Sequence, residues 1–106
     1  MTKERERLPN RRASETLQFD HGGFRYVASV GRFPDGRLAE VFLSGPKVGT
    51  DVAFAARDAS IMCSIGLQYG VPIEAFRHAI ARNSDGSAAG PLGKLLDLLA
   101  TKGAST

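Results

Sequence analysis

The hydrophobic period changes abruptly near residue 50, and this change constrains the fold more than any other feature of the sequence. Between residues 16 and 44 apolar and polar side chains alternate, as at Tyr26, Ala28 and Val30. Beyond residue 50 apolar side chains recur at steps of three and four. The first period is that of a strand with one buried face, and the second is that of an amphipathic helix. Strands followed by helices predict an α+β domain.

Two turns divide the alternating block into three strands. The sequence HGG (21–23) follows residues 16–20, and FPDGR (33–37) separates residues 24–33 from residues 37–44. Glycine supplies the positive φ that short turns need, and proline and aspartate favour turn formation. The sequence therefore predicts a three-stranded antiparallel meander over residues 16–44.

Helices are predicted over residues 51–69 and 72–82, and a third begins at Pro91 and carries a leucine stripe. Thr50 suits the N-cap of the first helix, and Gly70 suits the left-handed position that closes it. The stripe expected to be buried on the first helix consists of Val52, Ala55, Ala56, Ala59, Met62, Cys63 and Gly66, widened by Phe54, Ile61 and Ile65. The first two helices are expected to cover one face of the sheet.

The other face of the sheet is expected to be uncovered and apolar. Alternation assigns Val27 of the second strand to it, together with Ala39, Val41 and Leu43 of the third. Exposed apolar surfaces of this kind mark interaction sites, and symmetric dimers are the commonest oligomers. Self-association as a homodimer is therefore predicted.

A length of 106 residues fits one modest core. The predicted organisation is a basic N-terminal arm (1–12), the α+β domain (13–82), and a loop, an amphipathic helix and a tail (83–106). No run of about 18 apolar residues exists, and the charged N-terminus has no apolar segment behind it, so no membrane association is expected. A single cysteine, Cys63, fits a cytoplasmic location.

The net charge of +3 lies entirely in the arm, which carries five basic and two acidic residues. A basic arm attracts polyanions or an acidic protein surface, but charge alone selects no partner. Its arginines alternate with glutamates and few aromatic residues stand near them for base stacking, so sequence-specific nucleic-acid binding is not favoured.

The loop before the first helix is the predicted anion or nucleotide site. Backbone N–H groups at a helix N-terminus bind anions, and a lysine beside them adds a full charge. The spacing is not that of a P-loop. A plain strand-to-helix connection is the alternative. The candidate residues are Gly45, Lys47, Gly49 and Thr50, with Arg11 and Arg12 from the arm.

Neither a catalytic site nor a metal site is predicted. Cys63 lies on the small-residue stripe and is interpreted as a packing group. Asp20 and His21 at a hairpin tip and His78 on a helix lack the recurring spacing of metal ligands, and no cofactor is expected. Asp58 and Glu40 are interpreted as buried charges paired with arginines of the meander, because a buried charge needs a partner. A general acid–base pair would be the alternative.

Several blocks in order resemble a known family. They are RLPNRRASET, a glycine hairpin ending in Phe-Arg-Tyr, GRFPDGRLAEVFL, KVGT and SIGLQYGVPIE, over residues 7–80. They resemble the TSCPD-type domain at the C-terminal end of cobalamin-dependent (class II) ribonucleotide reductases, and small stand-alone bacterial proteins of that family. The chain lacks the redox cysteines and the radical machinery of a reductase.

The resemblance implies a free-standing, non-catalytic accessory or regulatory module of deoxyribonucleotide metabolism, with a ribonucleotide reductase or another protein as partner. A nucleotide or nucleic-acid binder that uses the arm and the Lys47 loop is the alternative. An independent enzyme is the third class.

Overall fold

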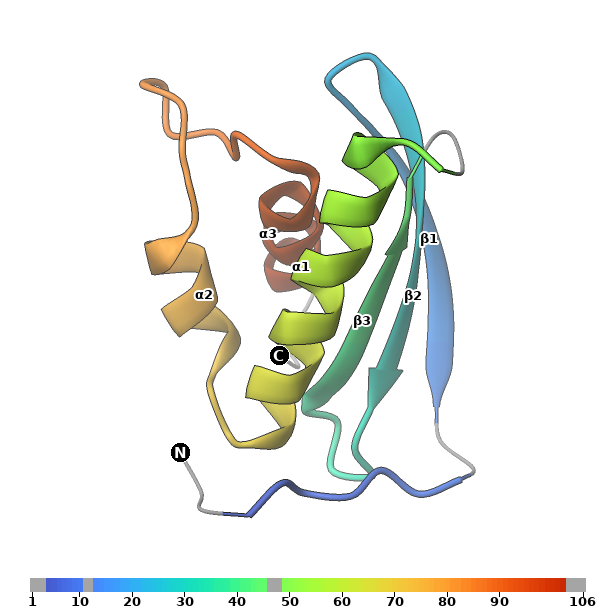
Figure 1. Ribbon diagram of the computed structural model, residues 1–106. Coiled ribbons are helices and arrows are strands. Elements are labelled where there is room, and N and C mark those ends of the chain that lie inside the picture. The colour runs from blue at the N-terminus through green and yellow to red at the C-terminus, as the bar shows by residue number, and fades with distance from the viewer. Residues whose placement is uncertain (1–3, 11–12, 46–48, 103–106) are drawn as a thin grey trace.

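The computed structural model describes residues 4–10, 13–45 and 49–102 and shows a three-stranded sheet and three helices (Figure 1). The elements are β1 (Ser14–His21), β2 (Phe24–Arg32), β3 (Leu38–Ser44), α1 (Asp51–Gln68), α2 (Ile73–Ala79) and α3 (Pro91–Lys102). The strands pair antiparallel in chain order, which confirms the meander and the α+β class. Each of these helices is too short or too polar to cross a membrane.

The predicted turn and cap residues adopt the expected conformations. Gly22, Gly23 and Gly36 have φ values of 59°, 83° and 95°. The Thr50 hydroxyl accepts a hydrogen bond from the Ala53 N–H and so caps α1. At the other end of α1, Gly70 has a φ of 92°. Its N–H donates to the Leu67 carbonyl, and the Val71 N–H donates to the Gly66 carbonyl. This pair of bonds is a Schellman motif, and it explains why α1 stops before the Val-Pro sequence.

The assignment of Ala39, Val41 and Leu43 to the uncovered face is wrong. Leu43 pairs with Ala28 and Val41 pairs with Val30, so these side chains share the core face. A β-bulge at Gly31/Arg32 shifts the register by one residue. Because side chains alternate along a strand, a shift of one residue exchanges the two faces of β3.

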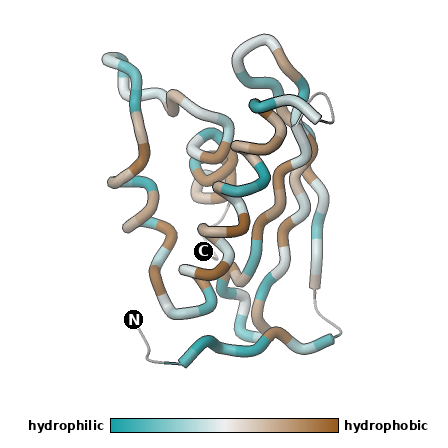
Figure 2. Tube along the Cα trace, in the orientation of Figure 1, coloured by the Kyte–Doolittle hydropathy of each residue, from teal (hydrophilic) through white to brown (hydrophobic). Residues whose placement is uncertain are grey.

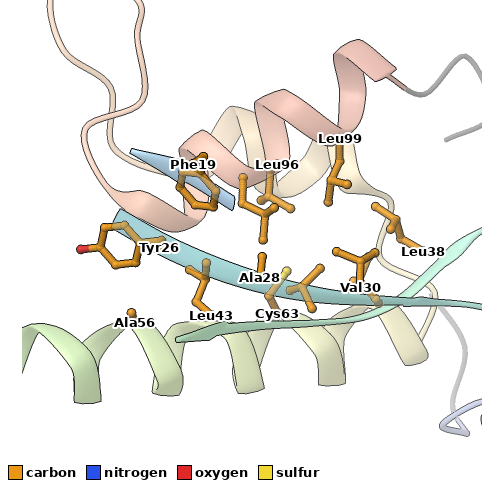
Figure 3. Packing of buried hydrophobic residues seen from close by; sticks show 13 residues of the cluster. Phe19, Tyr26, Ala28, Val30, Leu38, Leu43, Ala56, Cys63, Leu96 and Leu99 are labelled. Atoms are coloured by element: carbon orange, nitrogen blue, oxygen red, sulfur yellow. The ribbon is translucent and has the colours of Figure 1, made fainter. Parts of the chain in front are cut away.

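The helix that covers the sheet together with α1 is α3, not α2. The side chains of Leu95, Leu96 and Leu99 are fully buried, and Leu96 and Leu99 point at the sheet (Figure 3). The α2 helix packs instead on α1 and α3, and its Phe76 lies against Gly66 of α1. The expectation that residues 72–82 cover the sheet is therefore wrong, and α3 belongs to the main core.

The α1 helix packs along the outer edge of β3 through polar side chains. The Ser64 hydroxyl accepts from the Val41 N–H and donates to the Val41 carbonyl, each at 2.9 Å. Ser60 and Gln68 lie one turn away on either side. The Leu43 N–H donates a hydrogen bond to the Ser60 hydroxyl, and the Gln68 side-chain amide donates one to the Ala39 carbonyl. The three side chains therefore bond the Val41 N–H and C=O, the Leu43 N–H and the Ala39 C=O, which a fourth strand would otherwise bond.

This packing corrects the predicted buried stripe of α1. The Met62 and Val52 side chains are 72% and 46% exposed, and Phe54 is 54% exposed. The buried residues of the helix are Ala56, Ser60, Cys63, Ser64, Leu67 and Gln68. Half of these residues are polar, because the helix faces a strand edge as well as the apolar core.

Candidate functional site

An open groove of about 690 Å³ lies between residues 5–10, β3 and α1. It is lined by Arg5, Glu6, Arg7, Leu8, Asn10, Glu40, Phe42, Ile61, Ser64, Ile65 and Gln68. Its apolar side chains are Phe42 from the uncovered face of β3 and Ile61 and Ile65 from the outer side of α1, with Leu8 from the N-terminal segment. Since the Phe42 side chain is 45% exposed, the groove offers apolar surface to a ligand or partner.

The N-terminal segment forms one wall of this groove and is hydrogen-bonded to the rest of the domain. The Glu6 N–H donates to the Gln68 carbonyl at 2.7 Å, and the Arg5 guanidinium donates to the Gln68 side-chain oxygen. The Arg37 guanidinium donates to both oxygens of the Glu6 carboxylate, each at 3.0 Å. Residues 4–10 thus run across the lower end of the sheet and α1 in Figure 1, and Figure 2 shows this segment as mostly hydrophilic.

Gln68 is the residue that connects the fold to the groove. Its amide N–H₂ bonds the Ala39 carbonyl at the β3 edge, while its side-chain oxygen and its backbone carbonyl hold Arg5 and Glu6. Gln68, Ser60 and Ser64 are not among the residues predicted from the sequence. The available signal was their spacing of four residues, which places them on one side of a helix.

The predicted anion site is only partly described. Lys47, Arg11 and Arg12 lie outside the described residues. Gly45 and Gly49 lie on either side of Lys47 in the sequence, and Gly49 has a φ of 85°.

The described part of that loop has structural roles. Gly45 approaches α1 so closely that a Cβ there would lie 2.8 Å from the Cα of Ala53. The Thr50 hydroxyl caps the N-terminal end of α1, and Asp51 lies in its first turn. An acidic side chain in the first turn complements the positive end of the helix dipole.

The remaining candidates have other surroundings. Cys63 is buried, and burial raises the pKa of its thiol to about 11, as expected of a packing group. Asp20 forms an ion pair with Arg25, and the His21 ring nitrogen lies 3.1 Å from the Ala89 carbonyl oxygen. His78 is exposed on α2. In the described residues, no three histidine, cysteine, aspartate or glutamate side chains gather as metal ligands.

The interpretation of Asp58 as a buried charge is wrong, because this residue and its neighbour Arg57 are exposed on α1. Glu40 is half-buried in the groove, where its carboxylate lies over Gly31. A side chain at position 31 would collide with that carboxylate.

A separate ionic cluster joins α2 and the following loop to α3. The Asp97 carboxylate accepts hydrogen bonds from Arg82 at 2.5 and 2.9 Å and from Arg77 at 2.9 Å. These bonds lower the pKa of Asp97 to about 2. Arg77 also pairs with Glu74 one turn earlier. Each arginine of the cluster is paired with a carboxylate, as is typical of a contact that stabilises the fold.

The TSCPD-domain family model matches residues 2–101, nearly the whole chain. The chain belongs to the TSCPD family. The matched region extends beyond residues 7–80 and includes α3, in keeping with the place of this helix in the core. No solved structure matches the chain at a significant level.

Several curated relatives of this TSCPD domain are described as vitamin B12-dependent ribonucleotide reductases. The Agrobacterium fabrum protein is 39% identical over 79 residues, which cover 74% of this chain and 6% of the relative. The Streptantibioticus cattleyicolor protein is 42% identical over 72 residues, or 68% of this chain and 12% of the relative. The Streptomyces coelicolor protein is also 42% identical over 72 residues, or 68% of this chain and 7% of the relative. The chain therefore spans only a small part of these relatives, their C-terminal region.

Proposed function

We propose that this TSCPD domain is a non-catalytic accessory module of deoxyribonucleotide metabolism that binds a B12-dependent ribonucleotide reductase. The observation that carries the proposal is the similarity itself. Between 68% and 74% of this chain matches a segment that makes up only 6% to 12% of each reductase. Such a segment is a module of a much larger protein, and its function has to be argued from its own surface.

The groove between residues 5–10, β3 and α1 is the proposed contact surface. Partly exposed Phe42 supplies an aromatic anchor, and Ile61 and Ile65 extend the apolar surface beside it. Arg5 and Arg7 on the N-terminal wall supply a polar rim. An aromatic and apolar centre with arginines around it is the composition of a protein–protein contact with an energetic hot spot.

The test is a binding measurement between the purified chain and the B12-dependent reductase of the same host. Phe42→Asp should raise the dissociation constant roughly tenfold or more, because a carboxylate at the centre of an apolar contact loses its hydration. Phe24→Asp is the matched control, since Phe24 is 48% exposed and lies at the hairpin tip. Equal affinities of the two variants would exclude the groove, and no binding by the unmodified chain would exclude the reductase as partner.

Nucleotide or polyanion binding is the second candidate, favoured by the concentration of the whole net charge of +3 in residues 1–12. In this alternative the Lys47 loop and the arm hold phosphate groups. Titration with ATP, dATP and a single-stranded oligonucleotide at two salt concentrations tests it. Lys47→Ala should weaken the binding without changing the fold, because a loop lysine contributes little to a core. Absence of binding to all three ligands would exclude this candidate.

A further inference from the structure

The two edge strands of the sheet, β1 and β3, differ in whether another element bonds their outward backbone groups. The outer edge of β3 is covered by Ser60, Ser64 and Gln68 of α1, which bond the outward Ala39 C=O, Val41 N–H and C=O, and Leu43 N–H. Along an antiparallel strand, residues whose N–H and C=O groups point to one side alternate with residues whose groups point to the other side. The outward direction of Val41 therefore determines the directions of the remaining residues in the sheet.

The outward groups of β1 follow from the register. Because Val41 points outward on β3, its neighbours Glu40 and Phe42 bond β2 at Gly31 and Ser29. The intervening β2 residues then bond β1, and the Arg32 N–H bond to the Ala13 carbonyl continues that series. The β1 residues whose N–H and C=O groups point away from the sheet are Ser14, Thr16, Gln18 and Asp20.

No element within the described residues bonds these outward groups of β1, and Figure 1 shows β1 at the outer side of the sheet. Three common protections of an edge strand, namely proline, lysine and a β-bulge, are missing from β1, although it carries Glu15 and Asp20. Its pairing with β2 runs without a bulge from Ser14 to His21. A regular edge strand of eight residues without these features is a template for strand pairing.

We propose that β1 pairs antiparallel with β1 of a second copy of this chain and forms a continuous six-stranded sheet. The pairing is centred on Leu17, which then faces Leu17 of the second copy. In this register Thr16 stands opposite Gln18, Ser14 opposite Asp20 and Glu15 opposite Phe19. No like charges face each other, and the partly buried Leu17 side chains meet at the two-fold axis.

The closed edge of β3 makes the assembly a dimer. A sheet that could grow at both edges would extend into a fibre, whereas one with a single open edge closes after one symmetric pairing. A second copy of β1 fits the open edge because the register centred on Leu17 sets no like charges opposite each other. This edge replaces the uncovered sheet face as the expected surface of self-association, because Val41 and Leu43 are buried in the core.

Thr16→Pro tests the pairing by sedimentation equilibrium over a range of concentrations. The Thr16 N–H points outward, so proline there removes no bond between β1 and β2. The unmodified chain should be a dimer, and the variant should dissociate with a constant roughly tenfold or more higher, since each dimer loses two main-chain hydrogen bonds. Phe42→Asp, on the uncovered face of β3, is the control and should remain dimeric.

A double lysine variant and a cross-linking experiment test the same pairing without a proline substitution. Thr16→Lys combined with Gln18→Lys keeps both side chains on the exposed face and sets ammonium groups opposite each other, so it should also be monomeric. Leu17→Cys should form a disulfide-linked dimer on mild oxidation, because directly opposed residues of a non-hydrogen-bonded pair are about 4.5 Å apart at Cα. Ser29→Cys, on the central strand, should form none.

Three results would overturn the proposal. The first is that the unmodified chain is a monomer at several hundred micromolar. The second is that the folded Thr16→Pro and double lysine variants remain dimers. The third is that Phe42→Asp abolishes the dimer. Circular dichroism of each variant establishes that it is folded. None of these measurements requires the reductase, so they are independent of its binding.

Discussion

At the scale of single residues, the hydroxyl of Ser64 determines how α1 docks on β3. It both accepts from and donates to Val41, and all of these atoms are buried. We predict that Ser64→Ala lowers the free energy of unfolding by about 2 kcal/mol, because it leaves a buried N–H and a buried C=O without partners. Chemical denaturation measures the change. Ser29→Ala, an exposed serine of β2, is the control and should change stability by less than about 0.5 kcal/mol.

Asp97 makes the stability of the fold depend on pH at acidic pH. Its pKa is lowered to about 2 by hydrogen bonds from Arg82 and Arg77. A carboxyl group whose pKa is lower in the folded state stabilises the fold above its unfolded pKa of about 3.9, and the contribution disappears as the pH falls towards 2. Asp97→Asn should therefore lower stability by about 1 kcal/mol at pH 7 and flatten the pH dependence between about pH 4 and 2. A parallel acid titration of the two proteins that shows the same slope would contradict this role.

At the scale of elements, the contact of α1 with α2 depends on Gly66. A Cβ at this position would lie 2.7 Å from the ring atom Cζ of Phe76. We predict that Gly66→Ala destabilises the domain by about 1 kcal/mol, because displacement of the ring outweighs the better helix propensity of alanine. In a Phe76→Ala background the same change should become neutral or stabilising. A double-mutant cycle measures this coupling, and additive effects would show that the two residues do not interact.

The elements also show what local pattern can and cannot predict. Turn residues and periodicity predicted the strands and helices because φ preferences and alternation are local properties. The face of β3 that meets the core depends on the bulge at Gly31/Arg32, which changes the register by one residue. Likewise, Ser60, Ser64 and Gln68 are buried because β3 is an edge strand, and this depends on the arrangement of the whole sheet. Hydrophobic periodicity counts such polar residues as exposed, so the groove beside them was not predicted.

At the scale of the whole molecule, the unequal distribution of charge leads to a last prediction. All of the excess positive charge lies in residues 1–12, and the remainder of the chain is neutral. If the chain binds polyanions, the slope of log affinity against log salt counts the phosphates that this arm neutralises. Deleting residues 1–12 should flatten that slope, but it also removes the contacts of Glu6 with Arg37 and Gln68. A charge-only variant is therefore the better test.

The charge-only variant replaces Lys3, Arg7, Arg11 and Arg12 with glutamine and keeps Arg5, which bonds Gln68. Its expected behaviour is an unchanged melting temperature with a shallower salt dependence of oligonucleotide binding, since the segment keeps the main-chain bond of Glu6 that holds it to α1. Lys47→Ala should lower affinity while leaving most of the slope. Fluorescence anisotropy at several salt concentrations separates these effects. A slope that is equal in the unmodified chain and the charge-only variant would show that the arm does not bind phosphates.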